Sequence, residues 1–221
     1  MWEFIKAGGW LMLPLVLCSI AALAIIIERF LRLKRIWVAP TQLCQQAILK
    51  LHSHQFNSDY EQQLSKISLG QILLKGYQFR QENPEFVKAQ MQAEAAIQIN
   101  QLEKNINFLG TIGSIAPLLG LLGTVLGIIE AFLAVNAGGI TDPAMLANGV
   151  SKALITTAAG MIVAIPALIF YRYFQRLIVE YVVEMEQQAT IFHAALFYDK
   201  SAKTQPLIQQ DRYVGQVTDE V

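Results

Sequence analysis

Polar and charged side chains inside apolar sequence are the residues of this chain that could do chemistry. Residues 149–166, GVSKALITTAAGMIVAIP, carry Lys152 and the adjacent hydroxyls of Thr156 and Thr157, and end at Pro166. The hydroxyls could serve as polar points in the wall of a cavity between helices. A lone threonine in a membrane helix usually bonds to a carbonyl of its own preceding turn, so hydroxyls alone are a weak signal. The ammonium of Lys152 either has an acidic partner or reaches the headgroups.

Glu130 is the acid that could pair with Lys152. It lies five residues before Val135, the end of one apolar stretch, and Lys152 lies three residues after Gly149, the start of the next. At 1.5 Å per residue both lie about 5–8 Å from the outer ends of helices that run in opposite directions. A pair would offset the ~2.5–3.5 kcal/mol expected for a lysine at mid-membrane. In the alternative interpretation Lys152 snorkels to the headgroups without a partner.

Three segments are long and apolar enough to place these side chains in a membrane. They are residues 10–28, 108–135 and 149–174, and about 20 apolar residues suffice to cross a bilayer as a helix. The composition agrees, because 54% of the 221 residues are hydrophobic and 15% are charged. Soluble domains contain about 25% charged residues. The sequence therefore predicts an all-α membrane protein with three transmembrane helices.

The distribution of Lys and Arg predicts the orientation of these spans. Basic residues occur between the first two spans and after the third, whereas residues 136–148 contain none. Basic loops stay in the cytoplasm. Residues 1–9 and 136–148 are therefore predicted to be periplasmic, and residues 29–107 and the carboxyl terminus cytoplasmic. No A-x-A cleavage site follows the first span, which favours a retained helix over a signal peptide.

The predicted cytoplasmic parts have helical patterns. Residues 85–107 are rich in helix formers and contain no Gly or Pro, so this helix is expected to run straight into the second span. Residues 175–198 are predicted to extend the third span as a helix that packs against other helices. Its apolar stripe recurs every three or four residues: Ile178, Val182, Met185, Ala189, Phe192 and Leu196. Residues 199–221 lose this period and are predicted to be a flexible tail.

Small residues form a seam along the second span. They are spaced alternately by three and four residues: Gly110, Gly113, Pro117, Gly120, Thr124, Gly127, Ala131 and Ala134. The third span has a matching set: Gly149, Ala153, Thr156, Gly160, Ala164 and Ala167. Small residues let helix backbones approach closely in lipid. The pattern favours tight helix packing, and the alternative is a cavity lined by both helices, with Thr124 and Thr157 as its polar points.

Several function classes find no support in the sequence. An intramembrane protease needs a Ser–His pair, an Asp pair or an HExxH helix, and none lies in the three spans. No phosphate-binding glycine loop is present. The 17 basic and 17 acidic residues cancel, which argues against a nucleic-acid surface. Cys18, Cys44 and the pair His52 and His54 do not make a metal-ligand set. We therefore expect no enzyme activity, cofactor or metal.

Two long motifs closely resemble the ExbB/TolQ/MotA family of bacterial inner-membrane motor subunits. They are GSIAPLLGLLGTVLGIIEAF and GVSKALITTAAGMIVAIPAL. Three spans with the amino terminus outside resemble ExbB or TolQ, and MotA has four spans. The opening segment KAGGWLMLPLVLCSIAALAIIIERF is similar to the ExbB branch. The resemblance covers about residues 1–198.

This resemblance implies a homopentamer in the inner membrane. In that family five copies surround two single-span partners of the ExbD/TolR type, whose aspartate carries protons through the pore, and the assembly powers TonB. By motif, the family's pore threonines fall on Thr124 and Thr157, with Thr156 beside them. The family places a glutamate where this chain has Lys152, so the role of that glutamate does not carry over. A TolQ-like subunit of the Tol–Pal envelope system is the alternative.

Overall fold

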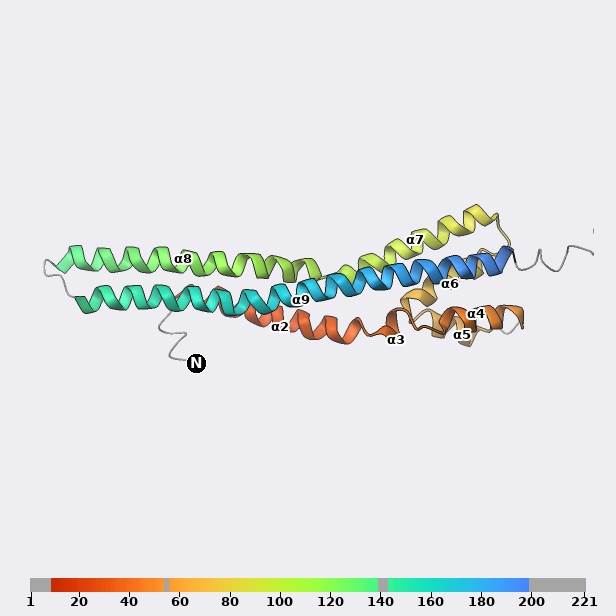
Figure 1. The fold of residues 1–221 in the computed structure, drawn as a ribbon, viewed down its shortest axis with the longest axis horizontal. Helices are drawn as coiled ribbons and strands as arrows, with labels where there is room; N and C mark the ends of the chain where they lie inside the picture. Colours follow the sequence, from red (N-terminus) through yellow and green to blue (C-terminus); the bar gives the residue numbers. More distant parts are fainter. Residues whose placement is uncertain (1–8, 54–55, 139–142, 199–221) are drawn as a thin grey trace, which may run out of the picture. The chain divides into compact units, whose positions relative to one another are not determined.

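Every regular element in the described part of the chain is a helix, as expected for an all-α protein (Figure 1). The computed structural model describes residues 9–53, 56–138 and 143–198. The helices are α2 (Met12–Arg32), α3 (Arg35–Val38), α4 (Leu43–His52), α5 (Ser58–Leu64), α6 (Ser68–Gln78), α7 (Pro84–Glu103), α8 (Ile106–Gly138) and α9 (Pro143–Phe197). Residues 1–8 of the predicted periplasmic amino terminus, residues 139–142 of the second predicted periplasmic segment and the predicted tail lie outside the described residues.

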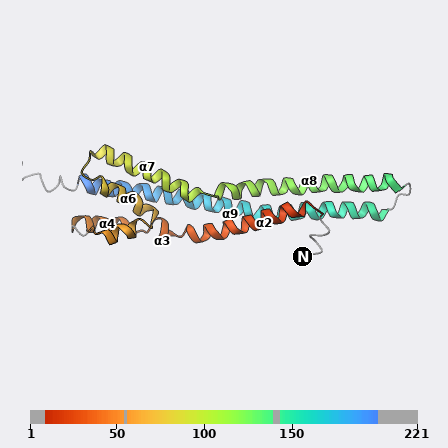
Figure 2. The same cartoon turned by 180° about the vertical axis from the view of Figure 1, so that it is seen from behind.

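The chain divides into two compact units. The first unit contains Met1–Lys34 and Asn100–Glu180, and the second contains Arg35–Ile99 and Tyr181–Val221. Helix α8 lies alongside the first part of α9 in both views (Figure 2). Because α7 and α9 pass from one unit to the other, each contributes side chains to both.

Three stretches of the described residues are long and apolar enough to cross a membrane. They are Met12–Arg32, a part of Pro84–Leu133 and a part of Leu146–Phe197. Each overlaps one of the predicted spans. Helix α9 begins at Pro143, where the missing N–H of proline costs no helical hydrogen bond.

The first unit is held together by contacts of α2 with α8 and α9. Met12 and Leu15 of α2 are buried against Ala116 of α8 and Ala164 of α9. Other large apolar side chains of α2, such as Leu17, remain exposed. A helix that is apolar all round and buried on one side only is typical of a membrane span.

The predicted continuous helix from residue 85 into the second span is corrected at one point. Helix α7 ends at Glu103 and α8 begins at Ile106. Between them Asn105 adopts a left-handed conformation with φ of 62°. A helix cannot continue through that conformation, and asparagine is one of the few residues besides glycine that adopts it readily.

The second unit packs larger side chains around the end of α9. Leu69 and Leu73 of α6 are buried in this unit, as are Met185 and Phe192 of α9. These two α9 residues belong to the predicted apolar stripe, so the expected packing of the extension is confirmed for them. Helix α9 continues without a break to Phe197.

Candidate functional site

Two glycines bring the backbones of α8 and α9 close together. A Cβ atom placed on Gly160 would lie 2.6 Å from the carbonyl oxygen of Ala116, and one placed on Gly120 would lie 3.0 Å from the Cα atom of Thr157. Both obstacles are backbone atoms. Any larger side chain at these positions would therefore push the helices apart.

The same contact continues on either side of this crossing. Gly113 faces the side chain of Leu168. Gly127 faces Ala153 and the carbonyl oxygen of Gly149. The two small-residue seams therefore pack against each other within one chain. This is tight packing of the kind that the spacing favours, and it involves both backbone atoms and side chains.

Thr156 and Thr157 use their hydroxyls differently although they are adjacent. The Thr156 hydroxyl donates to the carbonyl oxygen of Lys152 in its own helix, at 2.6 Å. The Thr157 hydroxyl donates across to the carbonyl oxygen of Gly120 on α8, at 3.0 Å. Because its proton is committed to Gly120, the Thr157 oxygen can offer a further partner only its lone pairs.

Thr124 follows the ordinary pattern of a membrane threonine. Its hydroxyl donates to the carbonyl oxygen of Leu121, one turn back in α8, at 2.6 Å. Thr124 lies one turn after Gly120, to which Thr157 is bonded. The two threonines thus have half-buried hydroxyls on facing helices, and each oxygen is left as an acceptor.

Glu130 and Lys152 are brought together across α8 and α9. The Lys152 Nζ atom lies 2.7 Å from Glu130 Oε2, and the two side chains are 32% and 57% exposed. Gly9, before α2, packs against the lysine stem, because a Cβ atom there would lie 2.5 Å from Lys152 Cε. In the structure the ammonium therefore has a carboxylate partner, where the alternative interpretation left it alone.

Arg29 at the end of α2 was not singled out from the sequence, where it is one of several basic residues after the first span. Its side chain is only 1% exposed, and Nη1 donates to the carbonyl oxygen of Leu102 at 3.1 Å. A buried guanidinium is costly unless it is paired and hydrogen-bonded. The sequence after the first span gave no signal for which of its cations would be buried.

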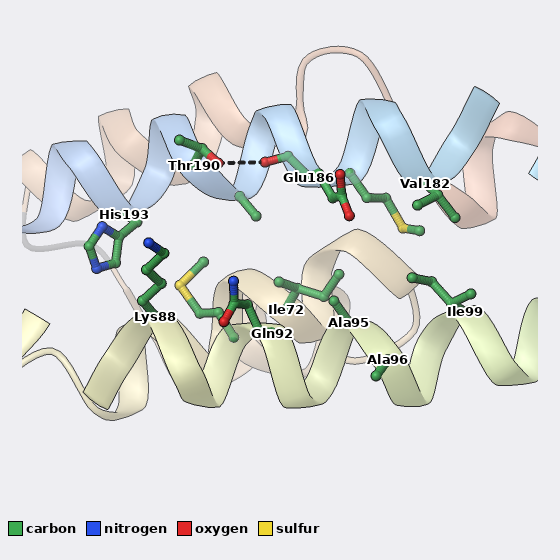
Figure 3. Close-up of a pocket in the computed structure, with 13 residues that line it drawn as sticks. Ile72, Lys88, Gln92, Ala95, Ala96, Ile99, Val182, Glu186, Thr190 and His193 are labelled. Carbon is green, nitrogen blue, oxygen red and sulfur yellow. Dashed lines mark hydrogen bonds between the residues drawn. The ribbon is translucent and has the colours of Figure 1, made fainter. Parts of the chain in front are cut away.

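A groove of about 540 Å³ lies between α7 and α9 in the second unit (Figure 3). Lys88 and His193 lie at one end, Glu186 projects into the middle, and Ile99 and Val182 line the other end. The His193 ring nitrogen is 2.9 Å from the carbonyl oxygen of Pro84. Among the described residues no group of three or more His, Cys, Asp or Glu side chains could hold a metal ion.

Cys44 is buried in the second unit. Its thiol donates to the carbonyl oxygen of Gln188 at 3.3 Å. Burial raises the pKa of the Cys44 thiol because the thiolate would lose its hydration there. Burial also raises the pKa of Tyr60, and the nearby Cys44 adds to the shift. Cys44 is thus held as a neutral thiol.

Comparison with known proteins places this architecture among transport proteins. Residues 64–187 match the MotA/TolQ/ExbB proton channel family. Putative biopolymer transport protein ExbB-like 1 of Synechocystis sp. is 36% identical over 174 residues, which cover 77% of this chain and 68% of that protein. Biopolymer transport protein exbB1 of Vibrio cholerae is 42% identical over 103 residues, 44% of this chain and 45% of the relative. Tol-Pal system protein TolQ of Haemophilus influenzae is 43% identical over 74 residues, 34% of this chain and 32% of the relative.

Proposed function

This chain belongs to the MotA/TolQ/ExbB proton channel family, and we propose that it is the pore subunit of a motor driven by the proton-motive force. The motor would energise a TonB-type protein and thereby transport across the outer membrane. The chain is a membrane protein of biopolymer transport with three helices apolar enough to span the bilayer. The family comprises channel and transport subunits, in keeping with a role that is not enzymatic.

The proposed assembly is a homopentamer in the bacterial inner membrane, with its amino terminus in the periplasm. Helices α8 and α9 face a central pore that holds ExbD-like single-span partners, and α2 faces lipid. The seam supports this arrangement, because it makes α8 and α9 one rigid pair within each copy. Large apolar side chains outside the seam remain exposed, such as Leu121 of α8 and Ile162 of α9. They are available for neighbouring copies, partner helices and lipid.

The hydrogen bond from Thr157 to Gly120 carries the proposed proton chemistry. Since Gly120 holds its proton, the Thr157 hydroxyl accepts a hydrogen bond but does not donate a second one. A protonated carboxyl group on a partner helix can donate to it, whereas an ionised carboxylate cannot. Thr157 would therefore stabilise the neutral, proton-carrying state in the pore. Thr124 has the same free acceptor and lies nearer the outer end of its span.

Lys152 and Glu130 form the outer charged element of this proposed pathway. An unpaired ammonium in a pore would repel protons and other cations. The carboxylate at 2.7 Å cancels that charge locally. The pair thus allows a lysine to occupy a position where the family pattern has a glutamate.

A Tol–Pal role is the second candidate, because TolQ of Haemophilus influenzae is among the relatives. Complementation separates the two roles. If the gene restores receptor-dependent uptake in a strain without its own motor subunit, the TonB role is supported. If it restores only detergent resistance and envelope integrity in a strain lacking TolQ, the Tol–Pal role replaces it.

Thr157→Val tests the proton pathway, with Thr157→Ser as the matched control. Valine removes the acceptor and the bond to Gly120, whereas serine keeps both. A net hydrogen bond of about 0.5–1.5 kcal/mol predicts up to a roughly tenfold loss of proton-coupled uptake in the valine variant, and little loss with serine. Native mass spectrometry reports whether the pentamer is intact. Wild-type uptake by Thr157→Val in an intact pentamer would show that Thr157 has no role in the pathway.

A further inference from the structure

The break between α7 and α8 leaves backbone groups that need partners. The last four carbonyl oxygens of any α-helix lack an N–H donor from their own helix. In α7, which ends at Glu103, these include Gln101 and Leu102. Asn105, in the left-handed conformation, then separates the end of α7 from the start of α8. The carbonyls of this last turn must therefore be satisfied from outside the helix.

Arg29 supplies the donors. From the end of α2, its Nη1 donates to the carbonyl oxygen of Leu102 at 3.1 Å and lies 3.4 Å from that of Gln101. The side chain is 1% exposed. A cation at a helix carboxyl end is favoured by the helix dipole as well as by these hydrogen bonds. Arg29 thus gives two carbonyls of this last turn a donor, although its own buried Nε has no hydrogen-bond partner among the described residues.

Glu28, the neighbouring residue, holds the other side of the break. Its Oε1 accepts from Arg29 Nη2 at 3.2 Å, and its Oε2 accepts from the side-chain amide of Asn105 at 3.2 Å. One carboxylate therefore links the cation that caps α7 to the residue whose left-handed backbone begins α8. Arg32 also reaches Glu28, at 3.4 Å, but its side chain is 68% exposed.

The position of the break determines which face of α8 meets α9. Each residue of an α-helix advances the side-chain direction by about 100°. A shift of the break by one residue would turn the seam by about that angle and move Gly120 away from Thr157. Ile106 and Leu109, at the start of α8, are buried and keep the present orientation.

We propose that Glu28 and Arg29 are positioning residues for proton coupling: they fix the α7–α8 break and thereby hold Gly120 opposite Thr157. The proposal rests on the proposed function. It adds residues that influence proton coupling from the start of α8, whereas Glu130 lies near the other end of that helix. Neither Glu28 nor Arg29 contacts the threonines. Their effect acts through the orientation of α8.

The test uses Arg29→Met, which keeps an apolar stem and removes the donors, with Arg32→Met as the matched control on the exposed cation. Arg29→Met should raise amide hydrogen exchange in the second turn of α8, where the N–H groups are bonded within the helix, on the order of tenfold, and should lower proton-coupled uptake in an assembled pentamer. Arg32→Met should change neither. Arg29→Lys, which can still donate to one carbonyl, should recover part of the loss.

A double-mutant cycle with Thr157→Val distinguishes positioning from general support of the fold. If Arg29 acts through the Gly120–Thr157 contact, the double variant is no worse than the more impaired single variant. If the two fold-losses multiply, or if exchange in α8 is unchanged, the proposal is overturned. If Arg29→Met does not assemble, the same double-mutant cycle is measured with Asn105→Gly. Glycine allows the left-handed backbone, so this substitution removes only the hydrogen bond to Glu28. If Thr157→Val alone is silent while exchange still rises, the break is held as described and the proposed function fails.

Discussion

Helix α9 packs against its neighbours in two different ways. Against α8 it brings Gly160 into contact with backbone, and no side chain separates the helices at that point. Against α7 it uses residues such as Met185, and a groove of about 540 Å³ remains with Lys88 and Glu186 on its lining. In lipid, association cannot rely on the hydrophobic effect, so close backbone contact must replace it. In the part predicted to be cytoplasmic, burial of large side chains suffices and gaps are tolerated.

The largest effect is expected from replacing glycine by alanine in these two kinds of contact, one in each unit. In Gly160→Ala the new Cβ atom would lie 2.6 Å from the Ala116 carbonyl oxygen, which the helix holds in place. In Gly76→Ala it would lie 2.7 Å from Met91 Sδ, the end of a flexible side chain. We expect Gly160→Ala to cost about 1–3 kcal/mol or to prevent assembly. Gly76→Ala should be nearly neutral, since the helix propensity of alanine offsets a methionine rearrangement.

Thermal unfolding of the detergent-extracted protein, together with the yield of assembled complex, measures both variants. Equal losses at Gly160 and Gly76 would mean that the two contacts are equally rigid. The contrast between backbone and side-chain packing would then not hold.

A smaller effect is expected at the ion pair of the first unit. Glu130 and Lys152 are both partly exposed, so their coupling should resemble that of a surface pair, about 0.2–1 kcal/mol. Glu130→Gln and Lys152→Met should each lower stability or uptake, and the double variant should recover part of the loss. The exchanged variant Glu130→Lys with Lys152→Glu should keep function. If the effects of the two single variants are strictly additive in this double-mutant cycle, the two residues are not coupled, and Lys152 is an interfacial anchor.

The smallest effect is expected at Cys44 in the second unit. Because burial raises the pKa of this thiol, the folded protein holds the proton more tightly than the unfolded chain. Its contribution to stability is therefore fully present below the unfolded pKa of about 8.5 and is lost as the pH rises through the higher folded value. Maleimide labelling should be slower in the folded protein than in denaturant at pH 7, and Cys44→Ala should flatten the alkaline fall in stability. Equal labelling rates would contradict the burial argument.

The parts of the site that follow from fixed helix geometry could be predicted from the sequence. Counting residues placed Glu130 and Lys152 at similar depth, because every residue of a helix rises by the same distance. The spacing of Gly120 and Gly127 likewise indicated one continuous face. These inferences needed only the period of the helix and the direction of successive spans.

What depends on tertiary contacts could not be predicted. Thr156 and Thr157 are identical neighbours, and only the position of α8 gives Thr157 a carbonyl outside its own helix. Arg29 stands among several cations, and it is buried because α7 ends beside it. Asn105 was the one available signal for that end, since asparagine favours the left-handed conformation. Because residues 85–107 contain no Gly or Pro, the end of α7 within them was not predicted.

The pairing of Lys152 with Glu130 also determines how this part of the protein responds to the membrane potential. One elementary charge that moves through 100 mV exchanges about 2.3 kcal/mol with the field. Joined at 2.7 Å, the ammonium and carboxylate sum to zero, so α8 and α9 carry the pair through any common displacement without electrical work. A lysine alone would make the same movement voltage-dependent. In the proposed pore, the potential would then act on the proton that crosses and not on this pair.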